Sequence, residues 1–244
     1  MNNDTSEYIP DGWGADELST FLRMAHNNAR ASFVNDRDHY QHLTKINAAF
    51  HTLILGMVDP PALLPPFFLM RTHAAFMSAV GLALSGQLPE CYMVLRGALE
   101  SSLYAYLSFC DPSVDEKWMN RNEKEDARVF VVKNFAPSII FPRLAKENEW
   151  LSSTAKELYE QTIDHGGHPN QLAIIGHLQE EETADGGVKW HLPYLTTEPR
   201  RRELAFLTCA RVGVCCLMIY GTIFTDLCAS MGLHSEFRRL SEGL

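Results

Sequence analysis

An arginine and a glutamate stand four residues apart in the most apolar stretch of the chain, and they are the residues best suited to chemistry. Residues 88–110 read LPECYMVLRGALESSLYAYLSFC and carry only three charges, Glu90, Arg96 and Glu100. Glu90 follows Pro89 in what would be the first turn of a helix, where a carboxylate suits the helix dipole. Arg96 and Glu100 would share one helix face. Because charges drawn into a core need partners, we expect this pair to face inward and to meet a polar group on another helix.

A turn rich in histidine and glycine offers candidate partners for this pair. Residues 165–170 read HGGHPN, and the two glycines and the proline would end the preceding helix. In a functional interpretation, Arg96 binds a phosphate or carboxylate through two hydrogen bonds, while His165 or His168 transfers protons beside Asn170. In a structural interpretation, Arg96 and Glu100 fix the register of neighbouring helices and the turn caps a helix. The residues alone leave both interpretations open.

Two histidines near a carboxylate are also a possible metal site. Asp164 directly precedes His165, and imidazole and carboxylate groups bind zinc and iron. The two glycines between His165 and His168 break the spacing of a helical ligand pair, and the chain has no Glu-x-x-His of the kind that di-iron bundles use. It also has no Gly-x-Ser-x-Gly, no P-loop and no Gly-x-Gly-x-x-Gly. We therefore expect neither a metal nor a cofactor.

Composition restricts the possible partners and compartment. The net charge of −9 argues against broad electrostatic binding to nucleic acid or anionic lipid, although residues 200–202 form a local run of arginines. All 6 cysteines lie in apolar helical runs without a Cys-x-x-Cys pair, which is typical of reduced, buried thiols in a cytosolic protein. Arg211 and Asp226 interrupt the apolar region 204–233, which favours a core helix over a membrane span. We expect a cytoplasmic protein that makes no membrane contact.

Apolar residues recur at helical spacing through most of the chain and predict a helical bundle around residues 88–110. Between residues 171 and 197 this pattern lapses, and strand-like flanks around Asp185-Gly-Gly predict a small β-hairpin near 174–195. We expect a mainly all-α, up-and-down bundle in one domain over 15–233, with an arm at 1–14 and a tail at 234–244. The expected helices cover residues 15–33, 43–57, 67–85, 88–110, 114–134, 149–164 and 199–229, with a short one between Pro137 and Pro142.

The stretch 85–100, SGQLPECYMVLRGALE, resembles a recurring signature of a group of bacterial helical proteins. In that group a glycine-containing turn leads into a helix bearing Leu-Arg-x-x-x-Glu, and a later helix ends in a histidine-glycine stretch. The resemblance covers residues 69–220 and extends to HEPN domains, helical bundles of toxin, abortive-infection and phage-defence systems. It implies a metal-independent ribonuclease or an RNA-binding component of a stress or phage-defence system, with RNA or a nucleotide as ligand.

The HEPN resemblance also points to Arg37 and His42. Active HEPN ribonucleases carry an arginine, a polar residue, three arbitrary residues and a histidine, and residues 37–42, RDHYQH, have that spacing. The alternative interpretation of these residues is an exposed polar helix start.

Two functional hypotheses follow from these patterns. In the first, the protein is a ribonuclease in which His165 or His168 acts as base on the ribose 2′-hydroxyl and Arg96 stabilises the charged phosphorane. In the second, it is a non-catalytic ligand sensor or oligomeric partner protein, the polar cluster is structural, and the apolar last helix forms the face of a homodimer.

Overall fold

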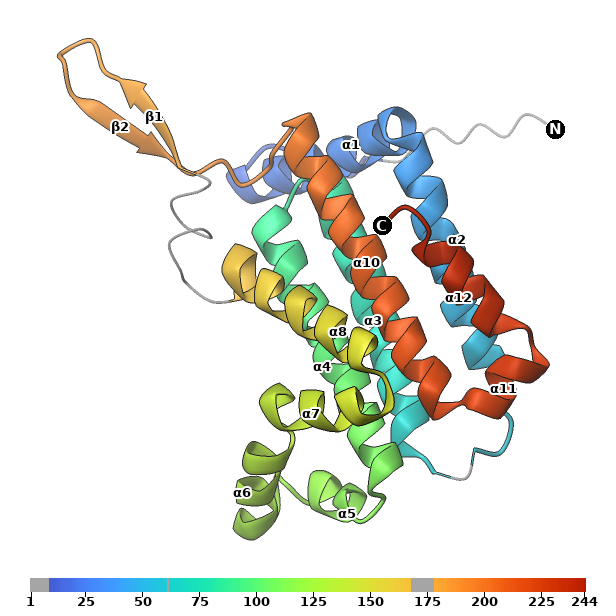
Figure 1. The fold of residues 1–244 in the computed structure, drawn as a ribbon. Helices are drawn as coiled ribbons and strands as arrows, with labels where there is room; N and C mark the ends of the chain where they lie inside the picture. Colours follow the sequence, from blue (N-terminus) through green and yellow to red (C-terminus); the bar gives the residue numbers. More distant parts are fainter. Residues whose placement is uncertain (1–8, 61, 168–177) are drawn as a thin grey trace.

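The computed structural model describes residues 9–60, 62–167 and 178–244, and these residues form a mainly helical bundle (Figure 1). The expected all-α architecture with one small hairpin is confirmed. The helices are α1 (Glu17–Asn35), α2 (Arg37–Leu55), α3 (Leu64–Ser85), α4 (Leu88–Cys110), α5 (Val114–Met119), α6 (Glu125–Asn134), α7 (Pro137–Glu147), α8 (Glu149–Thr162), α10 (Pro199–Ile223), α11 (Thr225–Ser230) and α12 (Leu233–Ser241), with a π-helical turn, η1 (Ile163–Gly167), after α8.

Helices α3, α4 and α10 lie side by side and form the centre of the bundle (Figure 1). Their shared core buries large aromatic side chains, including Phe76, Tyr106 and Tyr220. The hydroxyls of Thr72 and Tyr220 hydrogen-bond to each other at 2.9 Å inside this core, so neither is left without a partner. The core is closely packed at Gly213 of α10, where an added Cβ would lie 2.7 Å from the Phe76 ring.

The turn between α3 and α4 depends on glycine, as the sequence predicts. Gly86 adopts a left-handed conformation with φ of 87°, which ends α3. Its carbonyl oxygen accepts a hydrogen bond from the backbone N–H of Thr196 at 2.9 Å, and an added Cβ would lie 2.4 Å from the Thr196 carbonyl oxygen. The segment that follows the hairpin is therefore fastened to the start of α4.

The predicted β-hairpin consists of β1 (Gln179–Glu182) and β2 (Val188–His191), which pair antiparallel and project from the helical body (Figure 1). Gln179 pairs with His191 and Glu182 with Val188. The turn contains Gly186 with φ of 81°, a backbone conformation that suits glycine. Both strands are almost entirely exposed, so their side chains contribute little to the core.

The helix expected over 114–134 is two helices, α5 and α6. Residues 120–124 (NRNEK) between them contain no apolar side chain, so a continuous helix would have nothing to bury along that stretch. Lys124 is extended and begins α6, and the ammonium of Lys117 contacts the Asp126 carboxylate at 2.7 Å across the break. The two short helices are thereby folded against each other.

The end of the chain also differs from the expectation. The last long helix ends at Ile223 because Phe224 leaves the helical conformation, and α11 follows. The residues expected to be a tail form α12, which buries Leu233, Phe237 and Leu240 against the core. Residues four and three positions apart fall on one helix face, which is why this short helix packs.

Helices α3 and α10 are each long and apolar enough to cross a membrane by length and composition. In α10, 78% of the most apolar 18-residue window is buried, so its apolar side chains are occupied within the chain. Little of this helix is therefore exposed for the homodimer face that the sequence suggested there. In α3 only 44% of the corresponding window is buried.

Five of the cysteines are buried, as the sequence suggests, but Cys110 at the end of α4 is exposed. The sulfur atoms of Cys91 and Cys209 lie 3.5 Å apart between α4 and α10, and both remain free thiols. Burial and the Cys209 neighbour raise the pKa of Cys91 well above its ordinary value, so this thiol packs as a small apolar side chain.

The close packing at Gly213 makes a testable prediction. Gly213→Ala should destabilise the protein by about 1–3 kcal/mol, because the new methyl group overlaps Phe76 and this cost exceeds the gain in helix propensity. Gly221→Ala in the same helix is the matched control, since its Cβ would make only ordinary contacts at 3.4 Å and beyond. Urea unfolding measures both, and equal stability of the two variants would contradict the packing argument.

Candidate functional site

Arg96 and Glu100 form a three-membered polar cluster with Tyr159 of α8. The Arg96 Nε donates a hydrogen bond to Glu100 Oε1 at 2.9 Å, and an Arg96 terminal nitrogen donates to the Tyr159 hydroxyl at 3.0 Å. The Tyr159 hydroxyl in turn donates to Glu100 Oε1 at 3.1 Å. The guanidinium also lies over the Tyr159 ring, 5.2 Å from its centre. The partner on another helix, which the sequence could not name, is therefore a tyrosine.

The electrostatics of this cluster favour a charged guanidinium on Arg96 and a protonated hydroxyl on Tyr159. Burial opposes the charge of Arg96, but the Glu100 carboxylate outweighs it and raises the pKa of the guanidinium. Burial and the charge of Glu100 both raise the pKa of Tyr159, so its hydroxyl stays protonated and donates to the carboxylate. The side chains of Arg96 and Glu100 are only 23% and 28% exposed. A charge pair that is closed in this way supports helix packing and leaves the arginine partly neutralised.

His165 lies on η1, next to the beginning of α4. Its ring packs against the ring of Tyr92 with centroids 5.2 Å apart, and Tyr92 stands one turn before Arg96 on α4. This position depends on Gly166, because a Cβ there would lie 2.1 Å from the Pro89 carbonyl oxygen. The histidine side chain is exposed. The structure thus brings His165 to the same side of the bundle as the Arg96 cluster.

His168 and Asn170, the other two residues of the predicted turn, lie outside the described residues. Within the ranges that are described, no group of three histidine, cysteine, aspartate or glutamate side chains lies close enough to hold a metal ion.

Arg37 and His42 do not converge within one chain. Arg37 is exposed and lies over the Phe33 ring, 4.5 Å from its centre. His42 is half-buried near the backbone of Leu240 in α12, and burial lowers the pKa of its imidazole. A spacing of five residues separates two side chains by about 140° around a helix, which explains why they face different neighbours. Residues with the RxxxxH spacing therefore form no joint site in this protomer.

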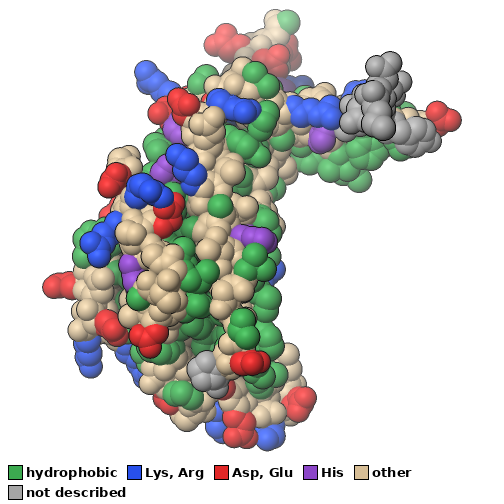
Figure 2. Space-filling model, turned by 90° about the vertical axis from the view of Figure 1, so that its right-hand side faces the viewer, with side chains coloured by type: hydrophobic (Ala, Val, Ile, Leu, Met, Phe, Trp, Pro, Cys, Tyr) green, Lys and Arg blue, Asp and Glu red, His purple; other side chains and the backbone are tan. Residues whose placement is uncertain are grey.

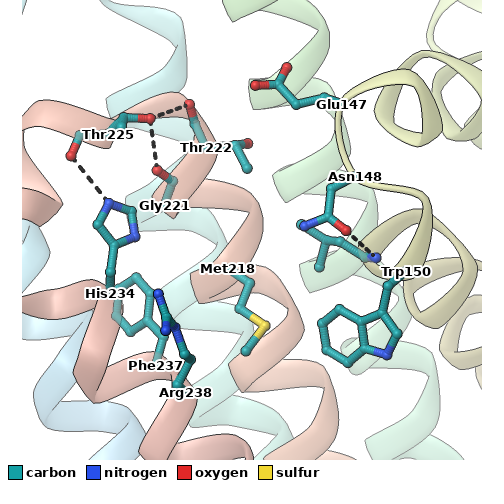
Figure 3. A pocket seen from close by; sticks show the side chains of 11 residues that line it. Glu147, Asn148, Trp150, Met218, Gly221, Thr222, Thr225, His234, Phe237 and Arg238 are labelled. Atoms are coloured by element: carbon teal, nitrogen blue, oxygen red, sulfur yellow. Dashed lines mark hydrogen bonds between the residues drawn. The ribbon is translucent and has the colours of Figure 1, made fainter.

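The sequence did not predict a pocket between α8, α10 and α12, which Figure 3 shows from close by. Its volume is about 340 Å³. Residues of α10 form its floor, the junction of α7 and α8 forms one wall, and α11 and α12 form the other. The lining residues are Glu147, Asn148, Trp150, Leu151, Met218, Gly221, Thr222, Thr225, His234, Phe237 and Arg238.

Local hydrogen bonds hold both walls of this pocket. Asn148 caps α8 by accepting a hydrogen bond from the Leu151 N–H at 2.9 Å, which fixes the residues on either side of the cap. On the opposite wall, the His234 ring nitrogen lies 3.3 Å from the Thr225 carbonyl oxygen and joins α12 to α11. Asn148 and His234 are therefore held by the backbone groups that they contact, and they fix the residues around them on the two walls.

The pocket carries opposite charges on its two sides. Glu147 and Arg238 lie on opposite walls in Figure 3, and the described part of the chain contains no ion pair between them. The Tyr106 hydroxyl lies 3.4 Å from Glu147 Oε2, behind the carboxylate. Trp150 supplies an aromatic surface on the α8 wall and Met218 an adaptable apolar floor. An arrangement of this kind suits a small molecule with an apolar body and two oppositely charged ends.

Two signals in the sequence point to this pocket. One is the apolar spacing of Leu233, Phe237 and Leu240, which marks α12 as a helix that packs. The other is Asn148 before Glu149, an N-cap residue followed by an acidic first turn. Nothing in the sequence indicates that these two segments meet across α10.

Comparison with known proteins finds no matching family model, no matching curated protein and no matching solved structure.

The Arg96 cluster makes a prediction about stability. Glu100→Gln should destabilise the fold by about 1–2 kcal/mol, because the guanidinium would lose its charged partner in a half-buried position. Glu125→Gln is the control, since Glu125 forms a comparable ion pair with Arg128 on an exposed surface, where such pairs contribute less than about 1 kcal/mol. Chemical unfolding measures the free energy of unfolding of both variants. An equal loss of stability in the two would mean that burial of the Arg96 cluster is unimportant.

Proposed function

We propose that this protein is a non-catalytic ligand-sensing helical module, with the pocket between α8, α10 and α12 as its ligand site. The observation that carries this proposal is the pair of opposed charges, Glu147 and Arg238, across a cavity with an aromatic and apolar lining. The hydrogen-bond cluster of Arg96, Glu100 and Tyr159 supports it too, because Glu100 on the same helix offsets the charge that Arg96 would offer to an anion.

The proposed ligand is a small zwitterion with an apolar body. The volume of about 340 Å³ lies at the lower end of the range for small-molecule sites, about 300–1,000 Å³, and accommodates a molecule the size of an aromatic amino acid. Its cationic group would contact Glu147 and its anionic group Arg238. Its body would pack between Trp150 and Met218.

Binding of free L-amino acids tests this proposal. A panel of aromatic and aliphatic L-amino acids should contain at least one that raises the melting temperature of the protein, since a ligand that binds only the folded state stabilises it. Arg238→Ala should weaken that ligand about tenfold or more, because a charge-assisted hydrogen bond is lost. Titration calorimetry measures the dissociation constant.

Arg239→Ala is the matched control for this experiment. Arg239 is the next residue on α12, but it forms an ion pair with Glu236 and does not line the pocket. Its replacement should leave the affinity unchanged. A panel without any binder tighter than about 1 mM, or an equal loss in both variants, would contradict the ligand site.

A second candidate function is the metal-independent ribonuclease that the HEPN resemblance implies, and one observation favours it. His165 is exposed beside Tyr92, one helical turn from Arg96. This is the placement that a general base near a phosphate-binding arginine would need.

RNA cleavage in the presence of EDTA tests the second candidate. If it is correct, the protein cuts single-stranded RNA to fragments with 2′,3′-cyclic phosphate ends, and His165→Ala lowers the rate by at least a hundredfold. His191→Ala is the control, because His191 lies on the exposed hairpin, where its ring contacts Glu181. Intact RNA with the wild-type protein, or equal rates in the two variants, would reject the ribonuclease.

A further inference from the structure

The paired helices α3 and α4 carry an outer face with large apolar side chains that no described residue covers. Phe67, Met70 and Met77 of α3 are 50%, 47% and 49% exposed, and Met93 of α4 is 47% exposed. Figure 2 shows the side of the molecule on which α2 and α12 lie in Figure 1, and hydrophobic side chains are exposed there too, among polar and charged ones. Contiguous apolar surface of this extent on a helical pair marks an interaction site more often than a solvated face.

The exposed and half-buried residues on the outer side of each helix form one ridge. On α3 they recur every three or four positions from Phe67 through Met70, Ala74 and Met77 to Gly81, which is the spacing of a single helix face. On α4 the corresponding ridge contains Glu90, Met93, Val94, Gly97 and Ser101. The two helices run antiparallel, and the Thr72 hydroxyl donates to the Ala98 carbonyl oxygen at 3.4 Å, which sets their register. The two ridges therefore lie next to each other on one surface.

Two glycines on this surface have no role within the chain. A Cβ added at Gly81 or at Gly97 would meet no described atom within 4 Å apart from its own stretch of helix, so alanine would fit at both positions. Glycine in a helix interior destabilises the helix relative to alanine. Close approach of another helix gives glycine a use at these positions, because the missing side chain lets two backbones come near.

The charges on the surface are complementary to those of a second copy. Arg71 and Glu90 are exposed, and neither forms an ion pair with another described residue. Arg71 lies one residue before Thr72, while Glu90 lies eight residues before Ala98 on the antiparallel helix, so the two are about 14 Å apart along the bundle. A two-fold axis that lies in the interface, perpendicular to the helices and midway between Arg71 and Glu90 along the bundle, brings the Arg71 of one copy level with the Glu90 of the other on the adjacent helix.

We propose that the α3–α4 surface is the interface of a two-fold symmetric homodimer, in which α3 and α4 of both copies form a four-helix bundle. Two Arg71–Glu90 ion pairs flank its apolar centre. The ridge from Phe67 to Gly81 is about 21 Å long at 1.5 Å per residue, and two adjacent helices are about 20 Å wide. Because side chains add to this flat area, each copy would bury about 500–600 Å² of its accessible surface in the interface. The total of about 1,000–1,200 Å² is that of a small specific interface. The inference does not depend on the proposed ligand, because the pocket involves α8, α10 and α12.

Charge reversal and charge exchange test the dimer by sedimentation equilibrium of the full chain. The wild-type protein should dimerise at micromolar concentration, and Arg71→Glu or Glu90→Arg alone should weaken the dimer at least tenfold through like-charge contacts. The double variant, Arg71→Glu with Glu90→Arg, should return to within about threefold of the wild type because it restores both pairs. This recovery separates an interface from a general effect on folding.

Two further variants sharpen the result. Gly97→Leu should abolish the dimer while circular dichroism stays unchanged, because the side chain points into open space in the monomer. Val132→Glu on the exposed face of α6 is the control and should not change dimerisation. A wild-type monomer at about 100 μM, a double variant as weak as the single ones, or a monomer that instead sediments with phosphatidylcholine vesicles would overturn the proposal. Loss of amino-acid binding with an intact dimer would count only against the ligand site.

Discussion

The burial of α4 decides where charge can lie in this protein. Helix α4 is packed by α3 on one side, by α10 on another and by α8 and η1 on a third, so most of its circumference is removed from water. A charge on such a helix is tolerated only where a carboxylate, a hydroxyl or solvent meets it. Arg96 and Glu100 lie on the strip that faces α8, and Tyr159 completes their hydrogen bonds. Glu90 lies on the remaining strip, which no described residue covers.

The same constraint explains why the Arg96 cluster is better suited to packing than to catalysis. Its arginine and glutamate are on one helix, so their pairing needs no ligand and is present whenever α4 forms. The tyrosine that joins them comes from α8, and its hydroxyl can donate only one hydrogen bond, which goes to the carboxylate. An anion that replaced Glu100 at the Nε of Arg96 would leave the carboxylate half-buried without its charged partner. The energetic cost of that exchange opposes binding of a phosphate on this side of the guanidinium.

Much of the fold follows from local patterns, while the pocket does not. The bounds of α4, its start after Gly86 and its end at Asp111-Pro112 are set by glycine and proline chemistry, and the hairpin is set by its turn residues, so these were predictable from neighbouring residues. The break between α5 and α6 was missed although residues 120–124 contain no apolar side chain, and the end of α10 was missed because apolar residues continue past it through Phe224 and Leu227. Arg96 and Glu100 could be recognised as a pair, but Tyr159 is 59 residues from Glu100, and no periodicity indicates that they meet. The pocket needs three segments from separate parts of the chain, and such a meeting is fixed by tertiary packing alone.

The position of α10 determines how the two proposed binding surfaces could communicate. Helix α10 forms the floor of the pocket on one side and packs against α3 and α4 on the other (Figure 1), so it contacts both regions, as does α8 through its packing on α4. Gly213 holds it close to Phe76 of α3, and the Thr72–Tyr220 hydrogen bond ties the two helices further along. A shift of α10 on ligand binding would therefore have to carry α3 with it. Because densely packed cores move as units, a change at the pocket would reach the α3–α4 surface as a displacement of α3. A ligand that favoured one position of α10 would then shift the equilibrium between monomer and dimer, and the size of the shift would equal the difference in the ligand's binding free energy for the two positions.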